Sequence, residues 1–383
     1  WAFLLFSKLG SGIYYASISS LGEKLMPLWI VGIMTGGGSF LQMFLDVGVG
    51  KILDKFGYLR LLKFSAFVFA LAGMCLLWQL NLYNFVLAFV FATIGWLFFE
   101  PGVNAYILSH APEKLAGQFV SFRDVFSAAG IVLSTLLLTQ VAGPIIAVAM
   151  LIAGILLFWC TPDAKIVEHA QKHHPHQLLP VLAKLNPASS ILLLLNFSAS
   201  CFYAVVWFVI PLVIVHQNRS NLLNLGLGMF DLAIVVLGFF LGKLADHHNK
   251  KHLVFGGLLL FSVAGLILSF NFSWLFLPLA FVAAAGDEMA GVSLWSWLHH
   301  LDRDHANDGM ISGVITLAYD LGWAVGPVMA GILYTQIGPS WTIAVSASFI
   351  FITWLIYLFM LNKHKSLPKV LVPHHPYRPR HKT

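Results

Sequence analysis

The sequence predicts an all-α membrane protein of twelve transmembrane helices, arranged as two six-helix bundles that are related by duplication. The first observation behind this prediction is composition. Hydrophobic residues make up 59% of the 383 residues and charged residues 10%, whereas soluble domains carry about 25% charged residues. The second observation is a short loop sequence that occurs twice, at 50–57 and at 242–251. A repeat of this kind divides the chain into two equivalent halves.

Twelve apolar runs are long enough to cross a bilayer, since a transmembrane helix needs about 20 residues. Strands of a membrane β-barrel are only about 10 residues long and alternate in polarity, so these runs are expected to be helices. The first run is expected to be a retained helix rather than a cleaved signal peptide. In chain order the runs cover residues 1–20, 27–50, 61–80, 85–107, 118–140, 143–161, 190–214, 224–246, 253–270, 274–297, 311–333 and 340–361.

Glycine and aspartate residues carry the repeat at one constant offset of 192 positions. The matched pairs are Gly50 and Gly242, Asp54 and Asp246, Gly117 and Gly309, and Gly130 and Gly322. One offset across all these pairs predicts that the halves share a fold. We therefore expect an N-terminal bundle at 1–162, a cytoplasmic His-rich linker at 163–187, a C-terminal bundle at 188–362 and a basic cytoplasmic tail at 363–383.

Lysine and arginine residues are distributed unevenly between the predicted loops. The loops on one side hold only Lys24 and Arg219, and the other basic loop residues lie on the opposite side. Because cytoplasmic loops carry the excess of Lys and Arg, we expect both termini in the cytoplasm and the protein in the inner or plasma membrane. The formal charge of +6 then describes an inner rim that faces anionic lipid, and no basic stretch indicates a nucleic-acid partner.

Cysteine and histidine residues give no sign of a metal site or of a disulfide framework. The three cysteines all fall inside predicted spans, where scattered thiols form neither. The histidine cluster at 169–176 could bind a metal or sense pH, but a solvated polar linker is the simpler interpretation. We expect no metal and no cofactor, with H⁺ as the coupling ion if transport is coupled.

With these features the chain resembles the major facilitator superfamily over nearly its whole length. The most specific element is the family loop Gly-x-x-x-Asp-Arg/Lys-x-Gly-Arg/Lys-Arg/Lys between spans two and three. The first copy here matches at Gly50, Asp54, Lys55 and Gly57, with Tyr58 and Leu59 at the two usual basic positions. The second copy keeps Gly242, Asp246, Lys250 and Lys251 but has Asn249 in place of the second glycine.

The resemblance implies that these two loops form a gating latch on the cytoplasmic side. In the family the latch joins helices two and eleven, and helices eight and five, when the transporter faces outward. Gly50 and Gly242 are expected to allow close helix packing. Asp54 and Asp246 are expected to accept hydrogen bonds from the N-terminus of a neighbouring helix and to pair with basic residues. The alternative is a plain cytoplasmic turn with solvated charges.

Ionisable side chains in the predicted spans need a reason, because each costs at least about 2.5 kcal/mol on insertion scales. The family lines its central cavity with helices one, four, seven and ten, which here contain Lys8, Glu100, Asp287 and Glu288. The candidates for proton coupling are Glu100, Asp287, Glu288 and Asp320, since close or desolvated carboxylates bind protons more readily. The alternative is a buried charge network with Lys8 or Arg123 that fixes helix packing. Asp46, Asp124 and Asp231 also fall inside predicted spans.

Aromatic and amide side chains could shape a solute cavity together with Lys8. The candidates are Tyr15, Trp96, Asn196, Trp207 and Trp295. Aromatic residues at helical spacing are also typical of core packing and of the membrane-interface belt, so both interpretations stay open.

These features predict a secondary active transporter that moves a small organic solute by alternating access with proton coupling, and not an enzyme. A passive facilitator and a drug/proton antiporter of the same fold are alternatives. The family's Gly-Pro motif falls at 322–327 in span eleven rather than in span five, which weakens the antiporter and favours a close-packed helix there. A receptor and an intramembrane protease are remote alternatives. The expected partners are the solute and the bilayer, with a slight preference for a cationic or amphipathic solute, and the protein is expected to work as a monomer.

Overall fold

The structure is a computed structural model that describes residues 2–78, 80–110, 116–137, 148–149, 152, 155–156, 187–217, 220–270, 272–301 and 308–363. Every regular element among these residues is a helix, so the predicted fold class is confirmed. The helices are α1 (Ala2–Gly22), α2 (Leu28–Phe56), α3 (Tyr58–Trp78), α4 (Leu82–His110), α5 (Ala116–Leu136), α8 (Pro187–Gln217), α9 (Ser220–His247), α10 (Lys250–Ser269), α11 (Phe276–Leu301) and α12 (Asp308–Lys363).

The last helix consists of two helices joined at Gly338, whose φ of 78° and ψ of 174° are not helical. Glycine is favoured there because L side chains rarely adopt a positive φ. The two parts of α12 correspond to the predicted spans 311–333 and 340–361. The predicted sixth span, 143–161, lies mostly outside the described residues, as do the linker and the tail, so the total of twelve stays a prediction. Within the described part, eight helices are long and apolar enough to cross a membrane.

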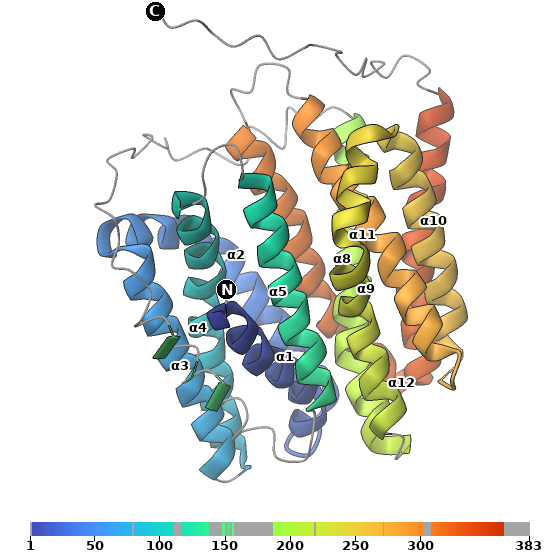
Figure 1. Ribbon diagram of the computed structural model, residues 1–383. Coiled ribbons are helices and arrows are strands. Elements are labelled where there is room, and N and C mark those ends of the chain that lie inside the picture. The colour runs from blue at the N-terminus through green and yellow to red at the C-terminus, as the bar shows by residue number, and fades with distance from the viewer. Residues whose placement is uncertain are drawn as a thin grey trace, which may run out of the picture.

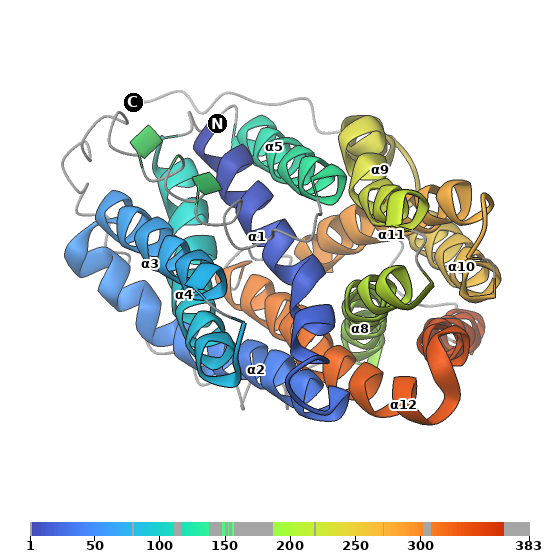
Figure 2. The same ribbon diagram turned by 90° about the horizontal axis from the view of Figure 1, so that it is seen from below.

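The helices run side by side as one bundle with α1–α5 on one side and α8–α12 on the other (Figure 1). Seen from below, α1 and α5 lie between α3 and α4 of their own half and α9 of the other half (Figure 2). Each half contains a hydrophobic cluster: Phe69, Phe85 and Phe99 belong to the first, and Phe202 and Phe261 to the second. The boundary between the halves therefore runs past α1, α5 and α9.

Glycine contacts show the duplication at the level of single atoms. A Cβ added at Gly130 of α5 would lie 2.9 Å from Cβ of Lys8 on α1. At Gly322 of α12, an added Cβ would run into Oγ of Ser200 on α8. The two glycines are 192 positions apart, and so are Lys8 and Ser200. The offset found in the sequence therefore relates helix contacts in one half to helix contacts in the other.

The two repeated loops make their turns in different ways. Gly57 joins α2 to α3 with a φ of 88°, a conformation that favours glycine. Asn249, which stands at the matching position, has an extended φ of −67° and caps α10. Its side chain accepts a hydrogen bond from the backbone N–H of Lys251 at 3.1 Å, as asparagine often does at a helix start. The second repeat therefore needs no glycine at this position, because Asn249 makes the turn as the N-cap of α10.

Candidate functional site

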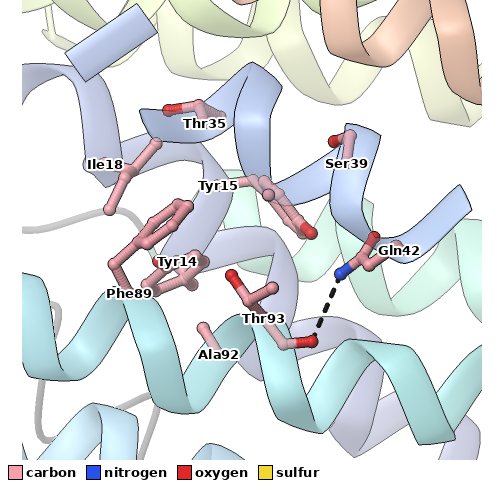
Figure 3. A pocket seen from close by; sticks show the side chains of 10 residues that line it. Tyr14, Tyr15, Ile18, Thr35, Ser39, Gln42, Phe89, Ala92 and Thr93 are labelled. Carbon is pink, nitrogen blue, oxygen red and sulfur yellow. Dashed lines mark hydrogen bonds between the residues drawn. The ribbon is translucent and has the colours of Figure 1, made fainter. Parts of the chain in front are cut away.

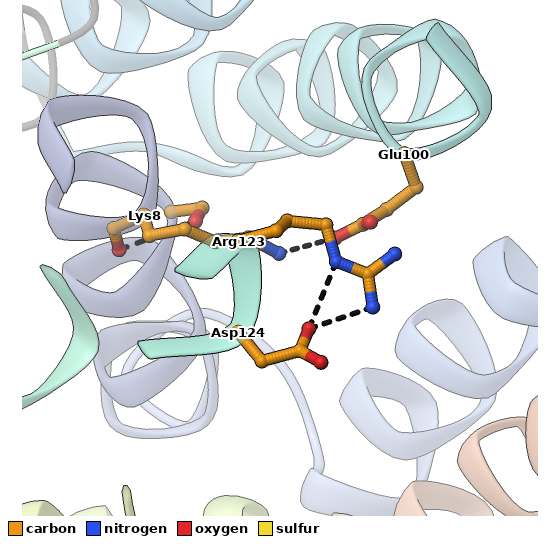
Figure 4. A network of polar contacts seen from close by, with 5 residues as sticks. Lys8, Glu100, Arg123 and Asp124 are labelled. Carbon is orange, nitrogen blue, oxygen red and sulfur yellow. Dashed lines mark hydrogen bonds and ion pairs between the residues drawn. The ribbon is translucent and has the colours of Figure 1, made fainter. Parts of the chain in front are cut away.

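An ion pair joins α1 and α4 inside the N-terminal half (Figure 4). Nζ of Lys8 donates to Oε1 of Glu100, and the two side chains are 11% and 36% exposed. The same ammonium group lies 4.4 Å from the centre of the Trp96 ring, within the range of a cation–π interaction. The structure thus brings together two predicted cavity residues and one predicted coupling residue.

Two adjacent charges of α5 extend this pair into a network (Figure 4). Arg123 donates to Oδ1 of Asp124 from Nε at 2.8 Å and from Nη2 at 2.6 Å. Both residues also interact electrostatically with Glu100. Since opposite charges offset the cost of burial for one another, this network fits the packing interpretation of Glu100 as well as the coupling one.

A row of aromatic rings leads from this network to the other half. The ring of Tyr15 stands edge-on to that of Trp96, with centroids 5.6 Å apart. Tyr15 also has Tyr14 at 5.5 Å and Trp323 of α12 at 6.4 Å, and Trp323 lies 6.3 Å from Tyr319. The predicted cavity residues Tyr15 and Trp96 therefore belong to an aromatic surface to which both halves contribute.

Three carboxylates of the C-terminal half lie on two neighbouring helices. Asp287 and Glu288 are adjacent on α11 and half-buried. Oε1 of Glu288 lies beside α9. If Gly238 of α9 carried a Cβ atom, that atom would lie 3.6 Å from Oε1. Asp231 of α9 is 7% exposed. All three carboxylates interact electrostatically with Tyr203 of α8, so they surround one region of this half.

Asp231 is the member of this group that the sequence did not single out. Its Oδ2 is buried and has no hydrogen-bond partner among the described residues. The sequence does contain a sign of its importance: Asp231 is the only ionisable residue in the apolar run 221–242. An isolated acid inside a membrane span marks a functional position by default.

The remaining predicted cavity and coupling residues lie on α8, α11 and α12. Trp207 is 7% exposed and packs in the hydrophobic core of the C-terminal half. Asn196 is half-buried on α8, where its carbonyl oxygen accepts a hydrogen bond from Ser200 at 2.8 Å. Asp320 is half-buried on α12. Trp295 lies on α11, and its side chain falls outside the described part of the structure.

The predicted latch residues lie where α2 meets α3 and where α9 meets α10. Gly50, Asp54 and Lys55 are on the last turns of α2, and Asp246 is near the end of α9; their side chains fall outside the described part. Lys250 begins α10. At Gly242 an added Cβ would meet no atom of the described residues within 4 Å, and the close packing expected there stays a prediction.

A pocket with about 300 Å³ of empty space, its open mouth included, lies between α1, α2 and α4 (Figure 3). None of its lining residues is charged. Gln42 donates from Nε2 to the carbonyl oxygen of Thr93 at 3.3 Å. At the position that matches Gly38 of this lining, the C-terminal half has Phe230; beside Gly38 itself, the ring of Phe89 lies 2.9 Å from the place of an added Cβ. The lining therefore offers uncharged polar and aromatic groups.

The two halves also contact each other at the end of the bundle where α1 ends, which we call the outer end after the predicted orientation. Nε2 of His216, on α8, lies 3.1 Å from Oε2 of Glu23, which follows α1. Nδ1 of the same ring lies 2.9 Å from the hydroxyl of Tyr334 on α12. We call these three residues the outer triad. They connect both halves across the boundary.

Glycines bring the helices of the two halves close together towards the same end. An added Cβ at Gly36 of α2 would run into the carbonyl oxygen of Ala324 on α12. At Gly228 of α9, 192 positions further on, an added Cβ would lie 2.5 Å from Oγ1 of Thr135 on α5. Because no side chain separates these helices, their backbones approach closely. The close packing expected for the Gly-Pro motif of span eleven is confirmed, since Ala324 belongs to it.

Comparisons with known proteins agree with this architecture. A family model described as Major Facilitator Superfamily matches residues 1–307 and 192–379. The chain is 21% identical over 359 residues to an uncharacterized MFS-type transporter of Enterobacter sp. (strain 638), with 90% of each covered. It is similar to a POT family transporter solved with a thioalcohol-conjugated peptide, with a TM-score of 0.72, 12% identity, and 94% of this chain and 95% of that chain covered.

A second solved structure has the same fold at similarly low identity. The human organic anion transporter MFSD10 matches with a TM-score of 0.66 and 13% identity, covering 93% of this chain and 97% of that one. The family match spans the duplication that the sequence shows and the helical bundle that the structure shows. The chain therefore belongs to the Major Facilitator Superfamily, whose members are multi-pass membrane transporters rather than enzymes.

Proposed function

We propose that this protein is a proton-coupled secondary transporter that moves a small organic solute across the inner or plasma membrane by alternating access. The observation that carries the proposal is the placement of the buried charges. The N-terminal half holds the Lys8–Glu100 pair, and the C-terminal half holds Asp287 and Glu288 on α11. Carboxylates at membrane depth are typical of proton relays in transporters.

The contacts between the halves support alternating access. With the termini in the cytoplasm, the outer triad and the Gly36 and Gly228 contacts close the bundle on the outer side. We propose that a site between the halves opens towards the cytoplasm when these contacts are closed, and outwards when they separate. The predicted latch at Asp54 and Asp246 is proposed to hold the opposite, outward-facing conformation.

The residues near the boundary favour a cationic or amphipathic organic solute. Asp287 and Glu288 supply negative charge, and the rings of Tyr15, Trp96 and Trp323 supply a flat apolar surface. Aromatic faces and carboxylates both attract organic cations. By their descriptions the solved relatives include an organic anion transporter and a peptide-bound transporter, so the solute class of this chain is inferred from its own residues.

The test is reconstitution in liposomes that contain a pH-sensitive dye, followed by a screen of pooled organic cations, zwitterions and anions. We expect a solute-dependent pH change inside the vesicles for the wild type and none for the Asp287→Asn/Glu288→Gln double variant. Solute exchange without a proton gradient is expected to persist in the variant. A variant that still couples solute to protons would remove these two carboxylates from the mechanism.

A passive facilitator is the second candidate, and the paired network favours it. Lys8, Glu100, Arg123 and Asp124 all have partners of opposite charge, so they can serve packing alone. A facilitator would equilibrate the solute across the same liposomes without a pH change and could not concentrate it. The liposome screen therefore separates the two functions directly.

A further inference from the structure

We infer that Asp231 of α9 is a proton-binding residue of the transport cycle and that Lys8 of α1, from the other half, controls when Asp231 releases its proton. The inference rests on the proposed proton coupling and adds to it a residue outside the predicted coupling set. Its basis is the burial of Asp231, its position beside the closing contact between the halves, and its electrostatic interaction with Lys8.

Burial without a partner is the first step of the argument. Asp231 is 7% exposed, and its buried Oδ2 has no hydrogen-bond partner within the part of the chain that the structure describes. A charged carboxylate held in this way would lose its hydration with no hydrogen bond at Oδ2 to replace it. The neutral acid, which carries a proton, is therefore the form that fits this conformation.

Position is the second step. Asp231 follows Gly228 by three residues, so the two residues lie on neighbouring parts of one helix face, about one turn apart. At Gly228, α9 contacts Thr135 of α5: a Cβ added to Gly228 would lie 2.5 Å from Oγ1 of Thr135. Asp231 is therefore one turn below a contact that has to open when the halves separate. Opening would admit water to this side chain.

Among the charges around Asp231, Lys8 is the group that can control proton release. Lys8 is the basic residue with which Asp231 interacts electrostatically. Lys8 packs on Gly130 of α5: a Cβ added to Gly130 would lie 2.9 Å from the Cβ of Lys8. Helix α5 in turn packs on α9. The surroundings also contain Tyr203 of α8. The neighbouring helices also carry Asp287 and Glu288 on α11 and Arg123 and Asp124 on α5, which pair with each other. Cys201 and His216 are further titratable residues of α8, and His299 and His300 of α11.

The duplication shows that acid and base were placed in different halves. The position that matches Asp231 in the N-terminal half is Ser39, and the position that matches Lys8 in the C-terminal half is Ser200. Each charge therefore has a serine as its counterpart at the same offset. An attraction between Lys8 and Asp231 acts across the boundary that moves during alternating access.

The proton step follows from these positions. When α5 and α9 separate, a hydronium ion from the outer water gives its proton to a carboxylate oxygen of Asp231 and becomes water. After the outer contacts close, as in this structure, the acid stays neutral until water from the inner side reaches Asp231. The O–H bond then breaks and the proton passes to that water. The positive charge of Lys8 favours the ionised carboxylate and therefore promotes this release, and the new attraction weakens the Lys8–Glu100 pair.

Infrared difference spectroscopy of the purified full chain tests this inference without any solute. The wild type should show the carbonyl stretch of a neutral carboxylic acid that disappears as the pH is raised. We expect this band to be lost in Asp231→Asn, to move in frequency in Asp231→Glu, and to remain in the control Glu168→Gln, which removes a carboxylate of the predicted linker. A band unchanged in Asp231→Asn would overturn the assignment of the proton.

The role of Lys8 is tested in the same experiment. Lys8→Met removes the positive charge that favours ionised Asp231, so the band should persist to higher pH than in the wild type. An unchanged titration would refute the control by Lys8. If the band behaves as expected but the wild type shows no solute-dependent proton movement in liposomes, the proposed function fails and the proton site has no part in coupling. If the wild type couples and Asp231→Asn couples equally well, only this inference fails.

Discussion

Replacing Gly36 with alanine should push the halves apart at the outer end. An added Cβ at this position would run into the carbonyl oxygen of Ala324 and lie 2.9 Å from Cγ2 of Val328. Because the first of these atoms belongs to the backbone, α2 and α12 must separate by about 1 Å or more to restore ordinary contact, at a cost of about 1–3 kcal/mol for overpacking. The outward-closed conformation should lose about 5- to 150-fold in relative population.

The neighbouring Gly37→Ala is the matched control, since an added Cβ there would meet no atom of the described part of the chain within 4 Å. Spin labels at Lys24→Cys and Ile337→Cys, in a background without native cysteines, would report the distance between the halves by pulsed electron paramagnetic resonance. We expect a longer-distance population that grows in Gly36→Ala and not in Gly37→Ala. Identical distance distributions in the two variants would refute the reasoning that this glycine contact closes the outer side.

Three further predictions follow from single contacts. A double-mutant cycle of Lys8→Ala and Glu100→Ala should give a coupling energy of about 0.5–3 kcal/mol in thermal unfolding, and a value near zero would show that the pair does not contribute. His216→Ala removes the contacts with Glu23 and Tyr334 and should enlarge the longer-distance population of the spin labels, whereas an unchanged distribution would show that the outer triad does not hold the halves together. Gly57→Ala should lower stability by about 1–2 kcal/mol, because alanine is strained at a φ of 88°, and an unchanged melting temperature would contradict this.

The fold and the duplication could be predicted from the sequence because both depend on patterns that can be read along the chain. Apolar runs of sufficient length indicate membrane helices, and a constant offset indicates equivalent halves. The same offset also relates contacts between helices: Gly130 packs against Lys8, and Gly322, 192 positions later, packs against Ser200. The sixth span and the latch side chains of Asp54 and Asp246 stay predictions, since they fall outside the described residues.

The pairing of residues within the site could not be predicted in the same way. Lys8 and Glu100 are 92 positions apart, and their contact depends on how α1 and α4 are rotated about their axes. In helices that are apolar on most sides, hydropathy does not define that rotation. For the same reason the sequence could not show that Trp207 packs in the core, or that Asp231 lies beside the closing contact of α5 and α9.

Proton-driven accumulation is the measurement that tests the proposed function most directly. Liposomes that contain the protein and a solute identified in the screen would be given an inwardly or outwardly directed pH gradient, and the internal solute would be followed with and without a protonophore. Proton coupling predicts that the solute becomes concentrated above its external level and that the protonophore abolishes this. Simple equilibration that ignores both the gradient and the protonophore would contradict coupling and identify the protein as a facilitator.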